Sequence, residues 1–264
     1  MNETPVSPTD SSTPKATTPP PGTVALRLPT VTPRVTYMIL GITIFIFILQ
    51  ILSRMFLGFD ALIDLGAKNN DAIRAGQLWR LFTPMLLHDS TFIWHIGFNM
   101  YALFALGAGL ERRIGHGRFL LLYVLAGFSG NVLSFLMTLM TKGLSVGAST
   151  SIFGLIAAEG VFLYQNRRLF GKEARRAMGN VLFVIMLNLF LGFSSGGLID
   201  NWGHIGGLLG GVVFTWFAGP RWEVTGIFPD YHLTDSREFR DIVLGASAVI
   251  IIFGALAVWK ITSK

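Results

Sequence analysis

The sequence contains no cysteine, and only 14% of its residues are charged. The absence of cysteine excludes disulfide bonds and thiolate metal sites. A soluble domain carries about 25% charged residues, so the shortage of charge indicates a chain whose main solvent is lipid. Hydrophobic residues make up 52% of the chain and its mean hydropathy is +0.57, which supports the same interpretation.

The formal net charge of +6 is the one feature that would suit a nucleic-acid partner. The cations lie between apolar runs rather than along one polar face, so we interpret them as determinants of membrane topology. We therefore expect no nucleic-acid partner. The sequence also lacks a cluster of metal ligands, and we expect neither a metal ion nor another cofactor.

Residues 1–33 differ in composition from the rest of the chain. They are rich in Pro, Thr and Ser, with Lys15 and Arg27 as their only cations. Such a segment cannot bury a core, and we expect a disordered tail. No apolar core precedes a small-residue cleavage site, so we expect the apolar run from Val35 to act as an uncleaved signal anchor.

Seven apolar runs have about the length that a membrane-spanning helix requires, roughly 20 residues. They are 35–53, 94–110, 119–141, 146–166, 179–199, 202–219 and 242–259. Their apolar residues are continuous rather than alternating, which favours helices over a β-barrel. The sequence therefore predicts an all-α polytopic membrane protein, with a loop over 221–241 before the last span.

The distribution of Lys and Arg predicts the orientation of these spans. Fourteen of the 21 lie in the N-terminal tail and the loops on one side, and seven lie on the other. The richer side is expected to be cytoplasmic, which places the N-terminus inside and the C-terminus outside. The external loop 54–93 is apolar enough to lie partly in the membrane interface, with Trp79 and Arg80 at the headgroup boundary.

Two polar residues open spans that enter from the predicted external side. Ser149 follows Gly147 at the start of the fourth span, and His204 lies at the start of the sixth. A histidine nitrogen within about 3 Å of a serine oxygen can act as its base. Gly207 and Gly211 lie one and two turns below His204, where small residues allow two helices to approach closely.

A second polar pair opens the second span from the same side. His95 and Asn99 are four residues apart and therefore share one helical face. Their N–H donors could join the backbone N–H of Ser149 in an oxyanion hole.

Each of these residues also has a simpler interpretation. Ser149 could be a small packing residue, His204 a packing or proton-relay histidine, and the pair at 95 and 99 an interhelical polar contact. Glu159 lies roughly 15 Å deeper than Ser149, and a neutral or hydrogen-bonded structural role is favoured. Asp200, four residues before His204, could orient the imidazole, but we expect it to face external water.

Taken together, the motifs resemble the rhomboid family of intramembrane serine proteases over residues 35–260. The motifs are Trp79-Arg80, His95-x-x-x-Asn99, Glu111 followed by Gly115, Gly147-x-Ser149, and His204 with Gly207 and Gly211. One departure is Thr150, where many members of the family have glycine after the serine. Thr150 and Ser151 are therefore rival hydroxyls, although only Ser149 has the Gly-x spacing.

The resemblance implies a six-helix catalytic core over 34–220, with 242–264 adding a seventh helix and an external tail. It implies a Ser149–His204 dyad, oxyanion contacts from His95 and Asn99, and Phe153 packed against the histidine ring. The implied partners are transmembrane protein substrates and the lipid bilayer, and a bacterial plasma membrane is favoured. A catalytically inactive relative that binds membrane clients and a transporter are the competing functions.

Overall fold

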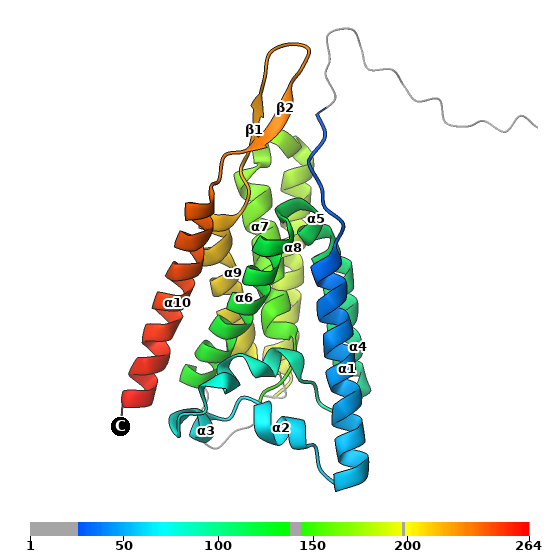
Figure 1. Cartoon of the computed structure of the whole chain (residues 1–264), viewed down its shortest axis with the longest axis vertical. Coiled ribbons are helices and arrows are strands. Elements are labelled where there is room, and N and C mark those ends of the chain that lie inside the picture. Colours follow the sequence, from blue (N-terminus) through cyan, green and yellow to red (C-terminus); the bar gives the residue numbers. More distant parts are fainter. Residues whose placement is uncertain (1–25, 138–143, 197–198, 264) are drawn as a thin grey trace, which may run out of the picture.

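The structure is a computed structural model that describes residues 26–137, 144–196 and 199–263. The axes of its long helices are roughly aligned, and the helices form one bundle (Figure 1). These helices are α1 Arg34–Leu57, α4 Ile93–Ala102, α6 His116–Met137, α7 Ser149–Gln165, α8 Arg167–Ser194, α9 Asn201–Ala218 and α10 Phe239–Thr262. After α4, the π-helical turn η3, Leu103–Gly107, leads into α5, Ala108–Ile114. The predicted helical polytopic fold is confirmed.

In the part of the chain that the structure describes, five helical segments are long and apolar enough to cross a membrane: α1, the α4–α5 segment, α6, α8 and α10. The other two predicted spans correspond to α7, which has 17 residues, and α9, which has 18. Both lie inside the bundle, where α6 and α9 pack against α7 and α10 packs against α9. Protein surrounds nearly all of α7 and covers the glycine-rich face of α9, so both helices tolerate a shorter apolar length and more polar residues.

The close packing of α7 against α9 depends on glycine. A Cβ atom at Gly207 would lie 2.0 Å from the carbonyl oxygen of Thr150, and one at Gly211 would lie 2.4 Å from that of Gly154. Both distances are far below van der Waals contact. The two helices therefore touch backbone to backbone, in the manner of small-residue helix pairs in membranes.

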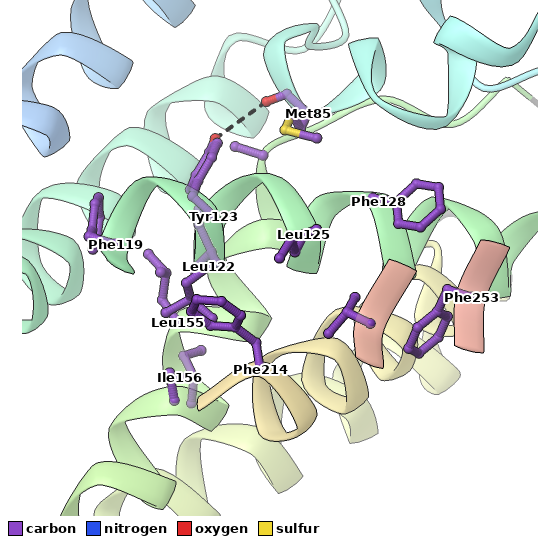
Figure 2. Packing of buried hydrophobic residues seen from close by; sticks show 14 of the residues in the cluster. Met85, Phe119, Leu122, Tyr123, Leu125, Phe128, Leu155, Ile156, Phe214 and Phe253 are labelled. Atoms are coloured by element: carbon purple, nitrogen blue, oxygen red, sulfur yellow. Dashed lines mark hydrogen bonds between the residues drawn. The ribbon is translucent and has the colours of Figure 1, made fainter. Parts of the chain in front are cut away.

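A hydrophobic core fills the space between α6, α7 and α9. Phe119, Leu122, Leu155 and Phe214 are buried together there (Figure 2). Tyr123 reaches from α6 toward the first loop, where its hydroxyl donates to the Met85 carbonyl at 3.5 Å. In contrast, α8 has very little buried surface and presents its apolar side chains outward, as a lipid-facing helix does.

The structure corrects the loop expected between the spans 146–166 and 179–199. Helix α8 already begins at Arg167, and it is kinked at Gly171, whose φ of 54° and ψ of −126° are not helical. The hydropathy of the sequence could not mark this start. It measures compatibility with lipid, and a helix can continue into water beyond the apolar run.

The first loop contains short helices at one end of the bundle: α2 Ala61–Gly66, α3 Asn70–Arg74, and the 3₁₀ turns η1 Leu78–Leu81 and η2 Thr83–Leu86. Trp79 is exposed, but the expectation that Arg80 lies at the headgroup boundary is wrong. Arg80 is buried, and its guanidinium donates to the carbonyls of Ala67 at 2.7 Å and Asp64 at 2.5 Å. Arg80 therefore joins two segments of the first loop and does not interact with lipid headgroups.

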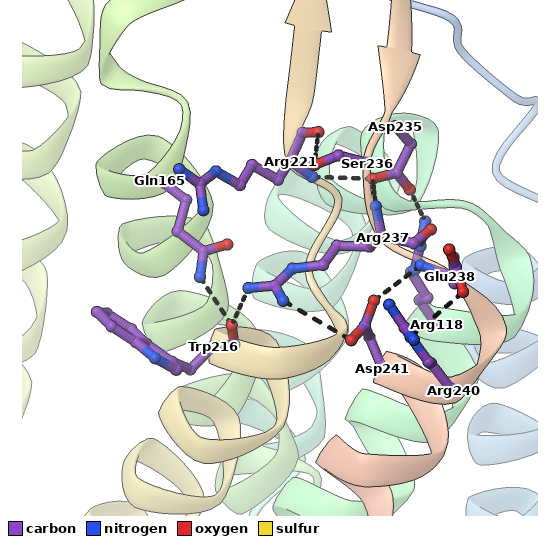
Figure 3. A network of polar contacts seen from close by, with 10 residues as sticks. All are labelled: Arg118, Gln165, Trp216, Arg221, Asp235, Ser236, Arg237, Glu238, Arg240 and Asp241. Atoms are coloured by element: carbon purple, nitrogen blue, oxygen red, sulfur yellow. Dashed lines mark hydrogen bonds and ion pairs between the residues drawn. The ribbon is translucent and has the colours of Figure 1, made fainter.

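The predicted loop 221–241 contains an antiparallel hairpin of β1, Trp222–Thr225, and β2, His232–Asp235. The hairpin projects from the end of the bundle opposite α2 and α3 (Figure 1). At its base Arg118 pairs with Asp235 at 2.7 Å, and Arg237 donates to the Trp216 carbonyl at 3.0 Å (Figure 3). The described part of the fold is thus helical with one small β-hairpin. Each strand has four residues that are mostly exposed, which is too short and too polar a pattern to predict from the sequence.

Two carboxylates hold helices together near the hairpin end. Glu111 is fully buried and accepts hydrogen bonds from the backbone N–H groups of Val35, at 2.9 Å, and Thr36, at 2.7 Å. It thereby caps the start of α1 from another helix. Glu159 is hydrogen-bonded, as one of the expected alternatives had it: both terminal nitrogens of Arg113 donate to its carboxylate oxygens in a bidentate ion pair.

Some predictions lie outside the described residues. These include most of the tail, 1–25, and the ends of two expected spans, 138–141 and 197–198. Residues 26–33 are described and form neither helix nor strand, and Val31 donates to the Arg112 carbonyl at 3.1 Å. Val31 thus lies beside α5.

Candidate active site

Ser149 and His204 lie together at the end of the bundle that carries the first loop. Ser149 is the first residue of α7, and His204 lies in the first turn of α9. Nε2 of His204 is 3.0 Å from Oγ of Ser149. The serine is half-buried and the histidine is buried, with 7% of its surface exposed. This distance allows the neutral imidazole to accept the serine proton.

The ring of His204 is fixed by packing on one face. The Phe153 ring, one turn after Ser149, is stacked on the imidazole with centroids 4.0 Å apart and planes 10° from parallel. Nδ1 of His204 is buried and has no hydrogen-bond partner in the described ranges. No carboxylate among these residues orients the ring through Nδ1, so the pair has the form of a dyad.

Neither of the two rival hydroxyls is hydrogen-bonded to His204. Ser151 is fully buried, and its hydroxyl faces the sulfur of Met85 at 3.9 Å. The Thr150 hydroxyl is buried without a partner among the residues that the structure describes. Successive helical residues are about 100° apart, so only one of three adjacent side chains can face a given neighbour.

Gly147 brings the loop before α7 close to His95. Its φ is +132°, and a Cβ there would lie 2.9 Å from Nε2 of His95 and 3.6 Å from Oγ of Ser149. Any other residue would strain the backbone and fill the space beside the serine. His95 therefore lies within reach of the same small region that Ser149 faces.

The hydrogen bonds of His95 indicate which nitrogen carries its proton. The Asp89 N–H donates to Nδ1 of His95 at 3.5 Å, which leaves Nε2 as the protonated nitrogen of a neutral ring. Nε2 is the atom directed toward Gly147. Asn99 is buried, and its amide donates to the His95 carbonyl at 2.8 Å, so one of its two N–H groups is occupied within the helix.

A further residue near the site is His88 of the first loop, for which the sequence favours a structural role over a hydrogen bond to substrate or to the lipid interface. It is fully buried in the first loop, and its Nε2 accepts the N–H of Ala148 at 3.3 Å, one residue before Ser149. Gln50 of α1 holds the His88 backbone with hydrogen bonds of 2.8 and 3.1 Å. Burial, with a smaller contribution from His95, lowers the pKa of His88 from 6.5 to about 3. A neutral ring is what an accepting Nε2 requires.

The carboxylate of Asp200 does not hydrogen-bond the imidazole of His204 and is held by other groups instead. Its carboxylate caps α9 by accepting the N–H of Gly203 at 2.9 Å, and it also accepts hydrogen bonds from Ser134 and Ser145. Within the described ranges, Asp200 is hydrogen-bonded to His204 through the backbone alone, where the His204 N–H donates to the Asp200 carbonyl at 3.1 Å. Asp200 is partly buried rather than fully exposed, because Ser134 of α6 and Ser145 of the segment before α7 contact its carboxylate.

Within the described ranges, no group of three or more His, Asp or Glu side chains could hold a metal ion. The fold and this geometry define a class: a helical integral membrane protein with a hydrogen-bonded Ser–His pair at one end of its bundle. The two residues come from neighbouring helices and meet among polar groups supplied by the first loop.

Comparison with known proteins gives the family. The family model described as "Rhomboid domain" matches residues 75–221, which is more than half of the chain. The chain belongs to the rhomboid family. The matched region includes both the Ser149 and the His204 segments.

Three curated relatives illustrate the similarity. The chain is 39% identical to "Rhomboid protease GluP" of Bacillus subtilis (strain 168), over 68% of this chain and 34% of that protein. It is 37% identical to "RHOMBOID-like protein 9, chloroplastic" of Arabidopsis thaliana, over 59% of this chain and 34% of that protein. It is 36% identical to "Rhomboid-like protease 1" of Toxoplasma gondii, over 58% of this chain and 51% of that protein. The chain thus spans between a third and a half of the length of these relatives.

Proposed function

We propose that this chain is an intramembrane serine endopeptidase that cleaves transmembrane segments of membrane proteins. The observation that carries the proposal is the 3.0 Å contact between Oγ of Ser149 and Nε2 of His204. Ser149 is the nucleophile: its oxygen attacks the peptide carbonyl carbon while Nε2 of His204 takes the proton. The imidazolium then returns that proton to the leaving amine, and water hydrolyses the acyl-enzyme with the same base.

Charge that develops on the carbonyl oxygen requires donors directed at one point. The N–H of Ser149 lies in the first turn of α7, where no intrahelical acceptor exists, at the positive end of the helix dipole. Nε2–H of His95 and the second amide N–H of Asn99 are the other donors that we propose. Loss of one such donor costs roughly 2.7–4 kcal/mol of transition-state stabilisation in other enzymes.

The decisive test is labelling of the detergent-solubilised full chain with a fluorophosphonate probe, which phosphonylates an activated serine. We expect labelling of the wild-type protein and none of Ser149→Ala. Thr150→Ala is the matched control and should still be labelled. Labelling that survives Ser149→Ala would refute this nucleophile, and a wild-type chain that never reacts would refute the protease.

We further propose that the site opens on the external face of the membrane, with the N-terminus cytoplasmic and the C-terminus external. The Lys and Arg distribution supports this orientation. In a bacterial plasma membrane, a reporter fused after Lys264 should be external, and one inserted after Arg168 should be cytoplasmic. A cytoplasmic reporter at position 264 would overturn the orientation but not the chemistry.

The proposed substrates are single transmembrane helices that unwind easily. A helix conceals its carbonyls in hydrogen bonds, so cleavage requires local unwinding, and water enters only near the mouth of the site. Substrates with Gly or Pro near the external end of their span should therefore be cut faster than leucine-rich ones. Equal rates for both would count against this access model.

A further inference from the structure

A buried lysine in the first loop needs an explanation that the proposed chemistry does not supply. Lys68 lies between α2 and α3 and is only 1% exposed. Its ammonium donates to the Ser134 hydroxyl on α6 at 2.8 Å. A buried charge is strongly unfavourable unless it is paired and hydrogen-bonded. A lysine in such a place therefore points to a negative group nearby.

That negative group is the carboxylate of Asp200. Oδ2 of Asp200 accepts the hydroxyl of Ser134 at 2.5 Å and the hydroxyl of Ser145 at 2.7 Å. Ser134 therefore stands between the ammonium of Lys68 and the carboxylate. The attraction of Asp200 partly opposes the lowering of the Lys68 pKa by burial. The first loop, α6 and the start of α9 are joined by one charged hydrogen-bonded chain.

The same chain returns to the backbone that precedes the proposed nucleophile. Lys68 and Ser145 form an isolated antiparallel bridge, with N–H···O distances of 3.0 and 3.2 Å. Ser145 precedes Ser149 by four residues, and Asp200 precedes His204 by four. The Ser145–Asp200 hydrogen bond thus directly joins the two segments that lead into Ser149 and His204.

We propose that Lys68 and Asp200 are positioning residues, which through Ser134 and Ser145 fix the separation of Ser149 from His204. This inference rests on the proposed function, and it assigns neither residue a contact with the substrate. A misplacement of about 1 Å in a reacting group can cost on the order of 10²-fold in rate. We call the hydrogen-bonded chain of Lys68, Ser134, Asp200 and Ser145 the strap. Its loss should therefore have a large effect on the chemical step.

The simplest competing explanation is that Asp200 only caps α9. Asp and Asn are about equally good N-caps. Asp200→Asn therefore keeps an acceptor for the Gly203 N–H but removes the charge that Lys68 faces. Lys68→Met removes the other charge and keeps much of the side-chain length. The double variant removes both charges and leaves no unpaired ion.

The experiment measures the fluorophosphonate reaction of the solubilised full chain as a maximal rate, kinact, and a half-saturating concentration, KI. For Asp200→Asn and Lys68→Met we expect kinact to fall by about tenfold or more with KI unchanged. The double variant should recover thermal stability relative to Asp200→Asn, yet keep a low kinact. Asp71→Asn and Lys260→Met are the matched controls, and both should react like the wild type.

A second measurement does not depend on peptidase chemistry. The chain has no cysteine, so Ser149→Cys introduces a unique thiol beside His204. An adjacent imidazole promotes the thiolate and speeds alkylation by iodoacetamide at neutral pH. Adding Asp200→Asn to this variant should slow the alkylation several-fold if the strap holds the pair together. Ser145→Ala, which removes one hydrogen bond, gives a smaller fall and serves if Asp200→Asn does not fold.

The proposal would be overturned if both single variants reacted with the kinact of the wild type. It would also be overturned if the substitutions changed KI and left kinact unaltered. A kinact that follows thermal stability, and recovers with it in the double variant, would show a scaffold role instead. A wild-type chain that fails to react with fluorophosphonate refutes the proposed protease, whereas the alkylation rates still decide whether the strap sets the Ser149–His204 distance.

Discussion

The imidazole of His204 lies parallel to the Phe153 ring, with their centroids 4.0 Å apart. This contact joins α9 to α7 beside the Ser149 oxygen and restricts the imidazole to one orientation. Nδ1 has no partner among the described residues, so we propose that stacking orients the ring as a carboxylate does in a catalytic triad.

Replacing the stacked ring should therefore lower the chemical rate. Phe153→Ala should reduce kinact for fluorophosphonate by about tenfold or more, since the imidazole gains rotamers that point away from Ser149. Phe153→Tyr should keep most of the rate. Phe190→Ala, which removes an exposed ring on α8, is the control for the loss of an aromatic side chain. An alanine variant at the wild-type rate would show that stacking is dispensable.

Removal of the base should be as damaging as removal of the nucleophile. His204→Ala should abolish substrate cleavage while the protein stays folded, and combining it with Ser149→Ala should cost nothing more, because the two residues act as one unit. Single-turnover cleavage and thermal unfolding, measured on the same samples, separate lost chemistry from lost structure. Near-normal turnover by His204→Ala would remove the dyad from consideration.

The helix packing behind the site is testable at a single glycine. Gly207→Val should remove activity and lower the melting temperature, because a Cβ there would meet the Thr150 carbonyl oxygen at 2.0 Å and separate α7 from α9. Gly254→Val in α10 is the matched control and should stay active, since a Cβ at that position has no atom within 4 Å. An active, stable Gly207→Val would refute the packing account of the active-site geometry.

Acid should destabilise the protein through His88. Its folded-state pKa is about 3 against an ordinary value of 6.5, so between those values the unfolded chain binds a proton that the folded chain does not. Stability is therefore fully present above pH 6.5 and is lost as the pH falls from there toward about 3. Melting temperatures between neutral pH and about pH 4 measure this loss.

The matched variant for this prediction is His88→Gln, whose amide oxygen can still accept the Ala148 N–H but does not titrate over this range. Its melting temperature should depend less on pH than that of the wild type. The same pH dependence in both proteins would assign the acid sensitivity to other groups.

The sequence by itself determined the class of protein. The apolar runs predicted the helices, because transfer into lipid depends on local composition over about 20 residues. The motifs around His95, Asn99, Gly147, Ser149 and His204 resembled those of the family, and such motifs are local and ordered along the chain. Helix ends were predicted less well. The boundaries of α8 and the hairpin at 222–235 depend on backbone hydrogen bonds that hydropathy does not measure.

Only the tertiary structure decided which distant side chains meet. Lys68 reaches Ser134, 66 residues away, and Ser145 reaches Asp200, 55 residues away. The partner of His88 lies 60 residues further along the chain at Ala148. No local pattern encodes such contacts, because each depends on how several helices and the first loop pack. The physical reason is that a buried polar group takes the partner that the fold brings to it, and sequence spacing alone does not identify that partner.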